Sequence, residues 1–150
     1  MAAATKNRNT PQTPGHRRGY PVVANARCFA GTVAVIDATG RVQPGKTGLD
    51  LIAVGVFEHL ADNLAGAAGD QTAEVLRGFF RLENSAADDA ITSAEIGQAC
   101  YLVDDQTVAK TDGAGTRSIA GIVDGVDDVG VWVLIDPTSG VHLVAPASAG

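Results

Sequence analysis

Short apolar runs rich in β-branched residues follow one another along the chain from Tyr20 onward. Glycine, aspartate, asparagine or proline interrupts these runs roughly every 8 to 15 positions, a spacing typical of an antiparallel sandwich or barrel. The pattern predicts eight strands and a ninth, weaker one near the C-terminus. Their ranges are 32–36, 51–57, 72–76, 79–83, 99–103, 107–110, 119–123, 129–135 and, for the weak strand, 141–144.

Four polar turns separate these runs, and each is predicted to be a hairpin connection. Their residues tolerate positive φ or bond their own backbone. They lie at 37–40, 104–106, 111–115 and 124–128. One short helix is predicted after Thr92, because Thr92 and Glu95 have the spacing of a capping box and Gly97 follows within about one turn. The range 62–68 is interpreted as a second, weaker helix or a loop.

The pattern predicts an all-β fold with three parts. Residues 20–136 form the β-rich domain, a small antiparallel β-barrel or sandwich with a β-clip-like form as one option. Residues 1–19 contain almost nothing to bury and are predicted to be a flexible, disordered or extended N-terminal arm. Fully extended, this arm would reach roughly 60 Å. Residues 137–150 are expected to form a C-terminal tail.

Charge is distributed unevenly along the chain. The net charge is −6, yet the first 36 residues carry five basic residues and no acidic one. We therefore predict an intersubunit arm in which Lys6, Arg8, Arg17 and Arg18 contact acidic neighbours, including the acidic body of a sister subunit. Because the rest of the chain is acidic, no direct nucleic-acid binding is expected. No apolar run reaches the length of a membrane span, and no secretory signal is visible, so a cytosolic product is expected.

The residues that usually carry chemistry are few and scattered. His16, His59 and His142 lack the spacing of a zinc site and are interpreted as surface or loop histidines. Cys28 and Cys100 are interpreted as buried small hydrophobes, with a disulfide between them left open. No GxSxG element or phosphate-binding loop is present, and the paired aspartates match no calcium loop. No catalytic residue, metal ligand or cofactor is predicted.

The aromatic residues fall in or beside the predicted strands, where core anchoring is the default interpretation. Phe79 and Phe80 are adjacent, so in a strand their side chains point to opposite faces. One of them must then meet a second layer, a partner subunit or solvent. We therefore treat Phe79 and Phe80 as candidate interface residues, together with the basic residues of the arm.

Gly48-Leu49-Asp50-Leu51, Arg117-Ser118 and Gly121-Ile122-Val123-Asp124 faintly resemble parts of the trimeric dUTP pyrophosphatases. That family has a sugar-stacking tyrosine after its central Gly-x-x-Asp element, whereas this chain continues Gly125-Val126-Asp127-Asp128. The Gly-rich C-terminal flap of the family is also missing, since the chain ends VHLVAPASAG. A trimeric nucleotide hydrolase is therefore the alternative hypothesis, and a small-ligand site in a barrel mouth is its broader form.

Four segments, taken in order, resemble the head decoration, or capsid cement, proteins of tailed bacteriophages. The similarity covers roughly residues 19–136. The segments are GYPVVANARCFAGTVAVIDATGRVQPG, LDLIAVGVFEHLADN, VLRGFFRLENSAADDAITSAEIGQACYLVDDQTVAKT and RSIAGIVDGVDDVGVWVLID.

This resemblance implies a structural virion protein and no active site. Such proteins bind the outer face of the capsid, often as homotrimers, and stabilise contacts between subunits of the major capsid protein. The expected partners are therefore the major capsid protein and further copies of this chain, on a virion assembled in the host cytoplasm. Related proteins also serve as bases of head spikes or fibres, so binding to a host surface is a further alternative.

Overall fold

Residues 2–143 are described by a computed structural model, and they form an all-β protein. This confirms the predicted fold class. The strands are β1 (Arg17–Pro21), β2 (Arg27–Cys28), β3 (Val33–Ile36), β4 (Val42–Pro44), β5 (Ile52–Phe57), β6 (Ala61–Asp62), β7 (Thr72–Leu76), β8 (Gly78–Asn84), β9 (Ala99–Leu102), β10 (Thr107–Ala109), β11 (Ile119–Val126) and β12 (Val131–Ile135). Three short 3₁₀ helices are η1 (Ala87–Asp89), η2 (Ser93–Glu95) and η3 (Val141–Leu143). Within residues 2–143, no helix has the length and apolarity needed to cross a bilayer.

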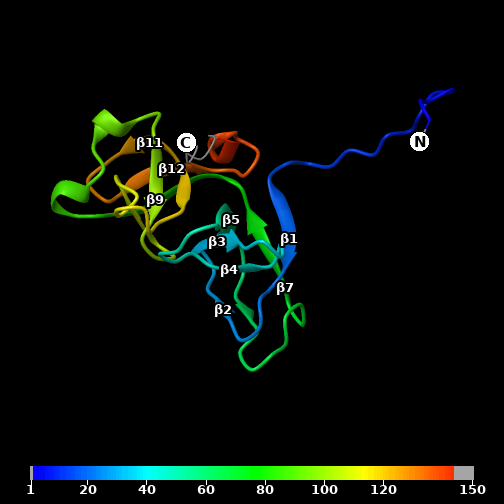
Figure 1. Cartoon of the computed structure of the whole chain (residues 1–150), viewed down its shortest axis with the longest axis horizontal. Coiled ribbons are helices and arrows are strands. Elements are labelled where there is room, and N and C mark those ends of the chain that lie inside the picture. The colour runs from blue at the N-terminus through cyan, green and yellow to red at the C-terminus, as the bar shows by residue number, and fades with distance from the viewer. Residues whose placement is uncertain (1, 144–150) are drawn as a thin grey trace.

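Strands β3 and β5 lie between two separate groups of buried side chains. They belong to a sheet with the order β1-β7-β5-β3-β4 (Figure 1). Val33 and Val35 of β3 point into one group, the barrel cluster, whereas Ala34 points into the other, the sheet cluster. β5 also contributes to both clusters. Because both faces of these strands are covered, their sequences are continuously apolar instead of alternating.

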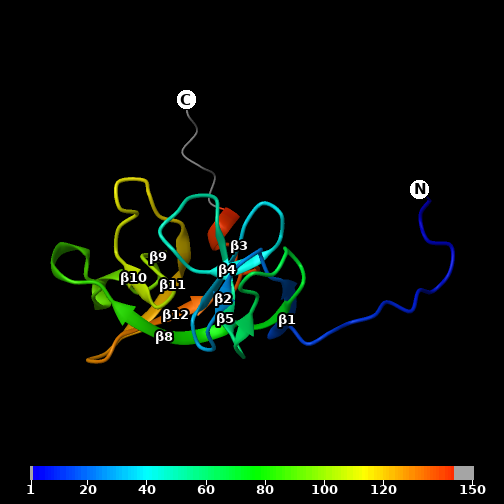
Figure 2. The same ribbon diagram turned by 90° about the horizontal axis from the view of Figure 1, so that it is seen from below.

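A closed barrel of five strands stands beside this sheet, with the order β10-β8-β12-β11-β9. Neighbouring strands are antiparallel except β10 and β8, which are parallel. The barrel cluster includes Leu102, Val123 and Val133 from the barrel, and it continues onto the facing side of the sheet. β7 passes into β8 through the single residue Arg77, so the chain runs directly from the sheet into the barrel (Figure 2). The sheet and the barrel also share the barrel cluster.

Gly55 allows β5 to pass close to β7. Its φ of +146° lies in a region that favours glycine. A Cβ at this position would lie 2.0 Å from the carbonyl oxygen of Leu76. The irregular pairing of β3 with β5 falls at the same point. A side chain here would therefore force the two strands apart.

The local strand and helix predictions are largely confirmed. The eight main predicted strands correspond to β3, β5, β7, β8, β9, β10, β11 and β12. The turns at 37–40 and 104–106 connect antiparallel neighbours, and so does the connection between β11 and β12. The capping box is present, with Thr92 and Glu95 bonding each other's backbone at η2. The range 62–68 contains the end of β6 followed by turns.

Several local predictions are wrong. The helix η3 stands where the weak strand at 141–144 was predicted. Residues 144–150, which include the end of that strand and of the predicted tail, lie outside the described residues. The turn at 111–115 is not a hairpin, because β10 pairs with β8 and β9 while β11 pairs with β9 and β12. The short strands β1, β2, β4 and β6 were not predicted. β1 begins inside the segment expected to be disordered or extended, and its pairing with β7 makes residues 17–19 extended.

Candidate protein-binding face of the barrel

The outer surface of β8 and β12 carries two large exposed aromatic side chains. Phe79 is 56% exposed and Trp132 is 37% exposed. Register pairing places Arg81 directly opposite Trp132, so Phe79, Arg81 and Trp132 lie on one face. Phe80 is half-buried against the barrel cluster, which confirms that the two adjacent phenylalanines point to opposite faces. We call the outer surface formed by Phe79, Arg81, Val129 and Trp132 the barrel face.

Contacts with Asp127 hold part of this face in place. The indole Nε1 of Trp132 donates to Asp127 Oδ2 at 2.9 Å, and Arg81 Nη1 lies 3.7 Å from the same oxygen. The guanidinium carbon of Arg81 is 5.6 Å from the centre of the Trp132 ring, within cation–π range. The hydrogen bond from Trp132, followed by backbone donors and the charge of Arg81, holds the pKa of Asp127 below its usual value. The tryptophan and arginine are therefore oriented before any partner arrives.

Val129 extends the barrel face into the turn between β11 and β12, where its side chain is 67% exposed. Beside it lies a hollow of about 280 Å³. Its lining residues are Gly31, Arg81, Leu82, Glu83, Gln106 and Val129. Ligand pockets usually enclose about 300–1,000 Å³, so this hollow lies just below their usual range. The expected core role of the aromatic residues is thus wrong for Trp132, and also for Phe29, which is 55% exposed.

The four basic residues predicted to form an interface do not gather in one place. Arg17 on β1 bonds Glu58 Oε1 at 2.5 Å, and Arg18 donates to the backbone oxygens of Pro14 and Arg17. Lys6 and Arg8 lie on the exposed segment that extends away from the body (Figures 1 and 2). Arg17 and Arg18 therefore lie next to each other on β1, at the base of the arm, and neither belongs to the barrel face.

Ser118 links two of the three segments that resemble a nucleotide hydrolase, its own and residues 48–51. Its hydroxyl donates to the Gly48 carbonyl at 2.7 Å and accepts from the Leu51 backbone N–H at 3.2 Å. The guanidinium of the neighbouring Arg117 bonds Asp89 Oδ2 at 2.8 Å and the Thr111 carbonyl at 3.1 Å. Both side chains therefore tie loops of this chain together, a role that their isolated sequence positions did not reveal.

The two cysteines are free and fully buried in different clusters, as the sequence predicted for small hydrophobes. Cys28 belongs to the sheet cluster and Cys100 to the barrel cluster. Burial raises the pKa of the Cys28 thiol to about 11 and that of the Cys100 thiol to about 12. Both thiols are therefore protonated at neutral pH and unsuited to act as nucleophiles.

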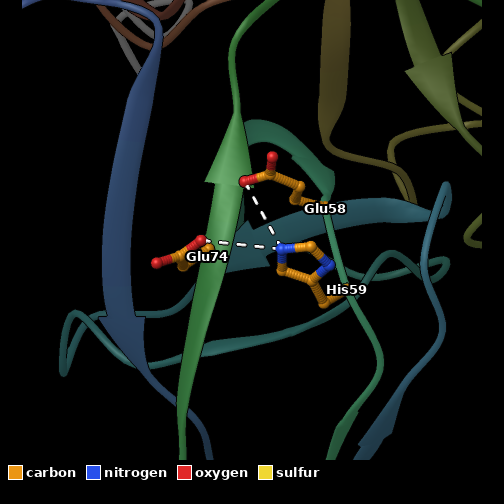
Figure 3. Close-up of side chains that lie close together, drawn as sticks. All are labelled: Glu58, His59 and Glu74. Atoms are coloured by element: carbon orange, nitrogen blue, oxygen red, sulfur yellow. Dashed lines mark ion pairs between the residues drawn. The ribbon is translucent and has the colours of Figure 1, made fainter.

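A second cluster lies on the sheet, where His59 stands between Glu58 and Glu74 (Figure 3). The sequence predicted that His59 is a surface or loop residue, and its side chain is indeed 71% exposed. Its proximity to the two carboxylates depends on the register of β5 against β7, because Glu58 and Glu74 are sixteen positions apart. No short sequence motif could reveal this grouping.

Comparison with protein-family models, with curated proteins and with solved structures finds no match for this chain. The structure alone therefore defines the fold class of this chain. The chain is a small all-β protein in which a closed five-stranded barrel shares its core with an antiparallel sheet.

Proposed function

We propose that this chain is a structural virion protein that binds the outer face of a phage capsid and cements contacts between major capsid subunits. The observation that carries protein binding is the barrel face, where Phe79, Val129 and Trp132 are exposed beside Arg81. Tryptophan and arginine dominate the energetic centres of protein interfaces, and aromatic residues are enriched there. The capsid as partner is inferred from the ordered segments that resemble head decoration proteins.

The contacts of the barrel face favour binding to a protein surface. Asp127 fixes the indole and guanidinium groups, so little side-chain freedom is lost when a partner covers them. In this proposal a side chain of the partner enters the adjacent hollow, which Arg81 and Val129 help to line. A capsid presents many equivalent copies of the same site, so a modest interface at each site is strengthened by multivalency when the protein binds as a trimer.

In this proposal the arm supplies a second contact. Lys6 and Arg8 lie on its exposed extended part, and Arg17 and Arg18 lie at its base. Exposed ion pairs contribute only about 0–1 kcal/mol each, so contacts of the arm backbone must add to them. Deleting residues 2–16 should lower occupancy on heads while leaving the β-domain folded, as checked by circular dichroism. Unchanged occupancy would refute a role of the arm in attachment.

The direct test is to mix the purified protein with phage heads that lack it and to measure co-sedimentation. Saturable binding with a fixed ratio to the major capsid protein, together with increased resistance of the heads to heat or chelators, is the expected result. Binding that does not saturate, or no binding at all, would refute the proposal. Release of pyrophosphate from nucleoside triphosphates by the same preparation would instead support the hydrolase alternative.

A further inference from the structure

The strands β5 and β7 bring two carboxylates and an imidazole together on the sheet. Val56 pairs with Leu76 and Phe57 with Val75. The Glu58 backbone N–H then donates to the Glu74 carbonyl at 2.9 Å, which continues this pairing by one residue. His59 follows directly and turns its ring toward both carboxylates (Figure 3). The cluster is thus positioned by the backbone of the sheet.

We propose that Glu58, His59 and Glu74 form a zinc-binding site. The Nε2 atom of His59 lies 3.9 Å from Glu58 Oε2 and 3.8 Å from Glu74 Oε2. The three donor atoms all lie within 4.8 Å of one another. One imidazole nitrogen and two carboxylate oxygens are donors that Zn²⁺ accepts, and three protein ligands with one open position are typical of accessible zinc sites.

A second observation at the same place also favours a cation. Glu58 Oε2 is buried and has no hydrogen-bond partner among the described residues, although it is the oxygen that faces His59. The side chain of Glu58 as a whole is only 19% exposed. An unsatisfied buried carboxylate oxygen is costly. A metal ion between Glu58, His59 and Glu74 would satisfy it.

Arg17 affects this site without filling it. Its guanidinium bonds the other oxygen of Glu58, Oε1, and thereby orients the carboxylate with Oε2 toward the cluster. The two glutamates and Arg17 together carry a net charge of −1 when His59 is neutral, which still favours a divalent cation.

Only small movements are needed for metal binding. Zinc bonds to nitrogen and oxygen are about 2.0–2.2 Å long, so tetrahedral ligand atoms lie about 3.4 Å apart. The distances of 3.9 and 3.8 Å from His59 Nε2 to the two carboxylates must therefore shorten by about half an ångström, and the distance between the two carboxylate oxygens, at most 4.8 Å, by up to about 1.4 Å. The side chains of His59 and Glu74 are 71% and 53% exposed, and they can rotate at little cost. The open coordination position faces solvent and would take a water molecule. This site lies on the sheet and does not depend on the proposed capsid binding.

The test is a calorimetric titration of the full-length protein with ZnCl₂ at neutral pH in a buffer that does not chelate metals. One Zn²⁺ per chain is expected. His59→Gln and Glu74→Gln should each weaken binding by at least about tenfold, because loss even of an outer partner of a metal ligand typically costs about 10–100-fold. The matched control is His142→Gln, which removes a half-buried histidine on η3 outside the cluster and should leave zinc affinity unchanged.

Cobalt provides an independent measurement of the geometry. Co²⁺ in place of Zn²⁺ should give the visible absorption of a four- or five-coordinate ion, and His59→Gln should abolish it. The proposal is overturned if the wild-type protein binds no zinc in the micromolar range. It is also overturned if His142→Gln weakens binding as much as His59→Gln does, since that would indicate adventitious binding. Circular dichroism of each variant separates loss of ligands from loss of fold.

Discussion

Replacing Phe79 by alanine tests the proposed role of the barrel face most directly. A phenylalanine side chain offers about 200 Å² of surface, of which 56% here, about 110 Å², remains exposed. Covering this area with a partner would contribute about 2–3 kcal/mol at about 25 cal/mol per Å². Phe79→Ala should therefore weaken binding to undecorated heads about 30- to 150-fold.

The same substitution should scarcely alter the fold, because the exposed side chain contributes little to the core. The free energy of unfolding in urea should change by no more than about 0.5 kcal/mol. The matched control is Leu60→Ala, since Leu60 is 57% exposed but lies in the connection between β5 and β6, outside the barrel strands. It should leave binding unchanged.

Affinity is measured by co-sedimentation at increasing protein concentration, with the occupied fraction determined from the ratio to the major capsid protein. If Phe79→Ala binds as tightly as the wild type while remaining folded, the barrel face is not the attachment surface. If Leu60→Ala weakens binding as much as Phe79→Ala does, the weaker binding of Phe79→Ala is not due to the loss of a contact at the barrel face.

Three further predictions concern stability and reactivity. Cys28 and Cys100 should resist thiol reagents in the native protein at pH 7 and both react in denaturant, because burial raises their thiol pKa values; a colorimetric thiol assay measures this. Gly55→Ala should lower the free energy of unfolding by about 2–4 kcal/mol in urea titrations, because the new methyl group would clash with β7. Hydrogen bonds from Arg117, and then from Thr111, lower the pKa of Asp89. Arg117→Gln should therefore lower the free energy of unfolding by about 1–2 kcal/mol at pH 7, measured by urea titrations at several pH values. The stabilisation by Asp89 is present above its unfolded pKa of about 3.9 and is lost as the pH falls through its lower folded pKa, so this cost should shrink toward pH 3.

Each of these predictions has an outcome that would contradict it. Rapid labelling of the native thiols would show that the cysteines are accessible. The control for Gly55→Ala is Gly69→Ala, because Gly69 also has positive φ but open space around its Cα. Equal losses at Gly55 and Gly69 would assign the effect to backbone strain instead of the close approach of β7. A cost of Arg117→Gln that is independent of pH would show that Asp89 is not its main partner.

The sequence predicted those strands that are specified by their own residues, without reference to their pairing partners. Alternating or continuous apolar runs bounded by turn residues define β7, β8 and β12 without knowledge of their partners. The strands β1 and β6 contain arginine, proline or aspartate, and their extended form depends on pairing with β7 and β2, which are distant in sequence. Strand β4 pairs with the adjacent β3, but its three residues include glutamine and proline and form no apolar run. Closure of the barrel by the parallel pair β8 and β10 is likewise a long-range event that no local pattern encodes.

The candidate sites also contain features that the sequence predicts and features that depend on the fold. The opposite orientation of Phe79 and Phe80 follows from the two-residue period of a strand and was predictable. The exposure of Trp132 was not, because a hydrogen bond to Asp127 compensates its polar nitrogen at the surface. The cluster at Glu58, His59 and Glu74 required the register of β5 against β7, which the sequence does not specify.

The way in which the arm joins the sheet has a mechanical consequence. Arg17, where β1 begins, pairs with Leu76, where β7 ends and the chain continues into the barrel. A pull between the arm and the barrel therefore acts on adjacent ends of two antiparallel strands. In this geometry the hydrogen bonds break one after another, as in a zipper, and no large force is needed. Separating the five residues of β1 from β7 would lengthen the arm by about 17 Å. The barrel therefore stays folded while the distance between it and the far end of the arm increases.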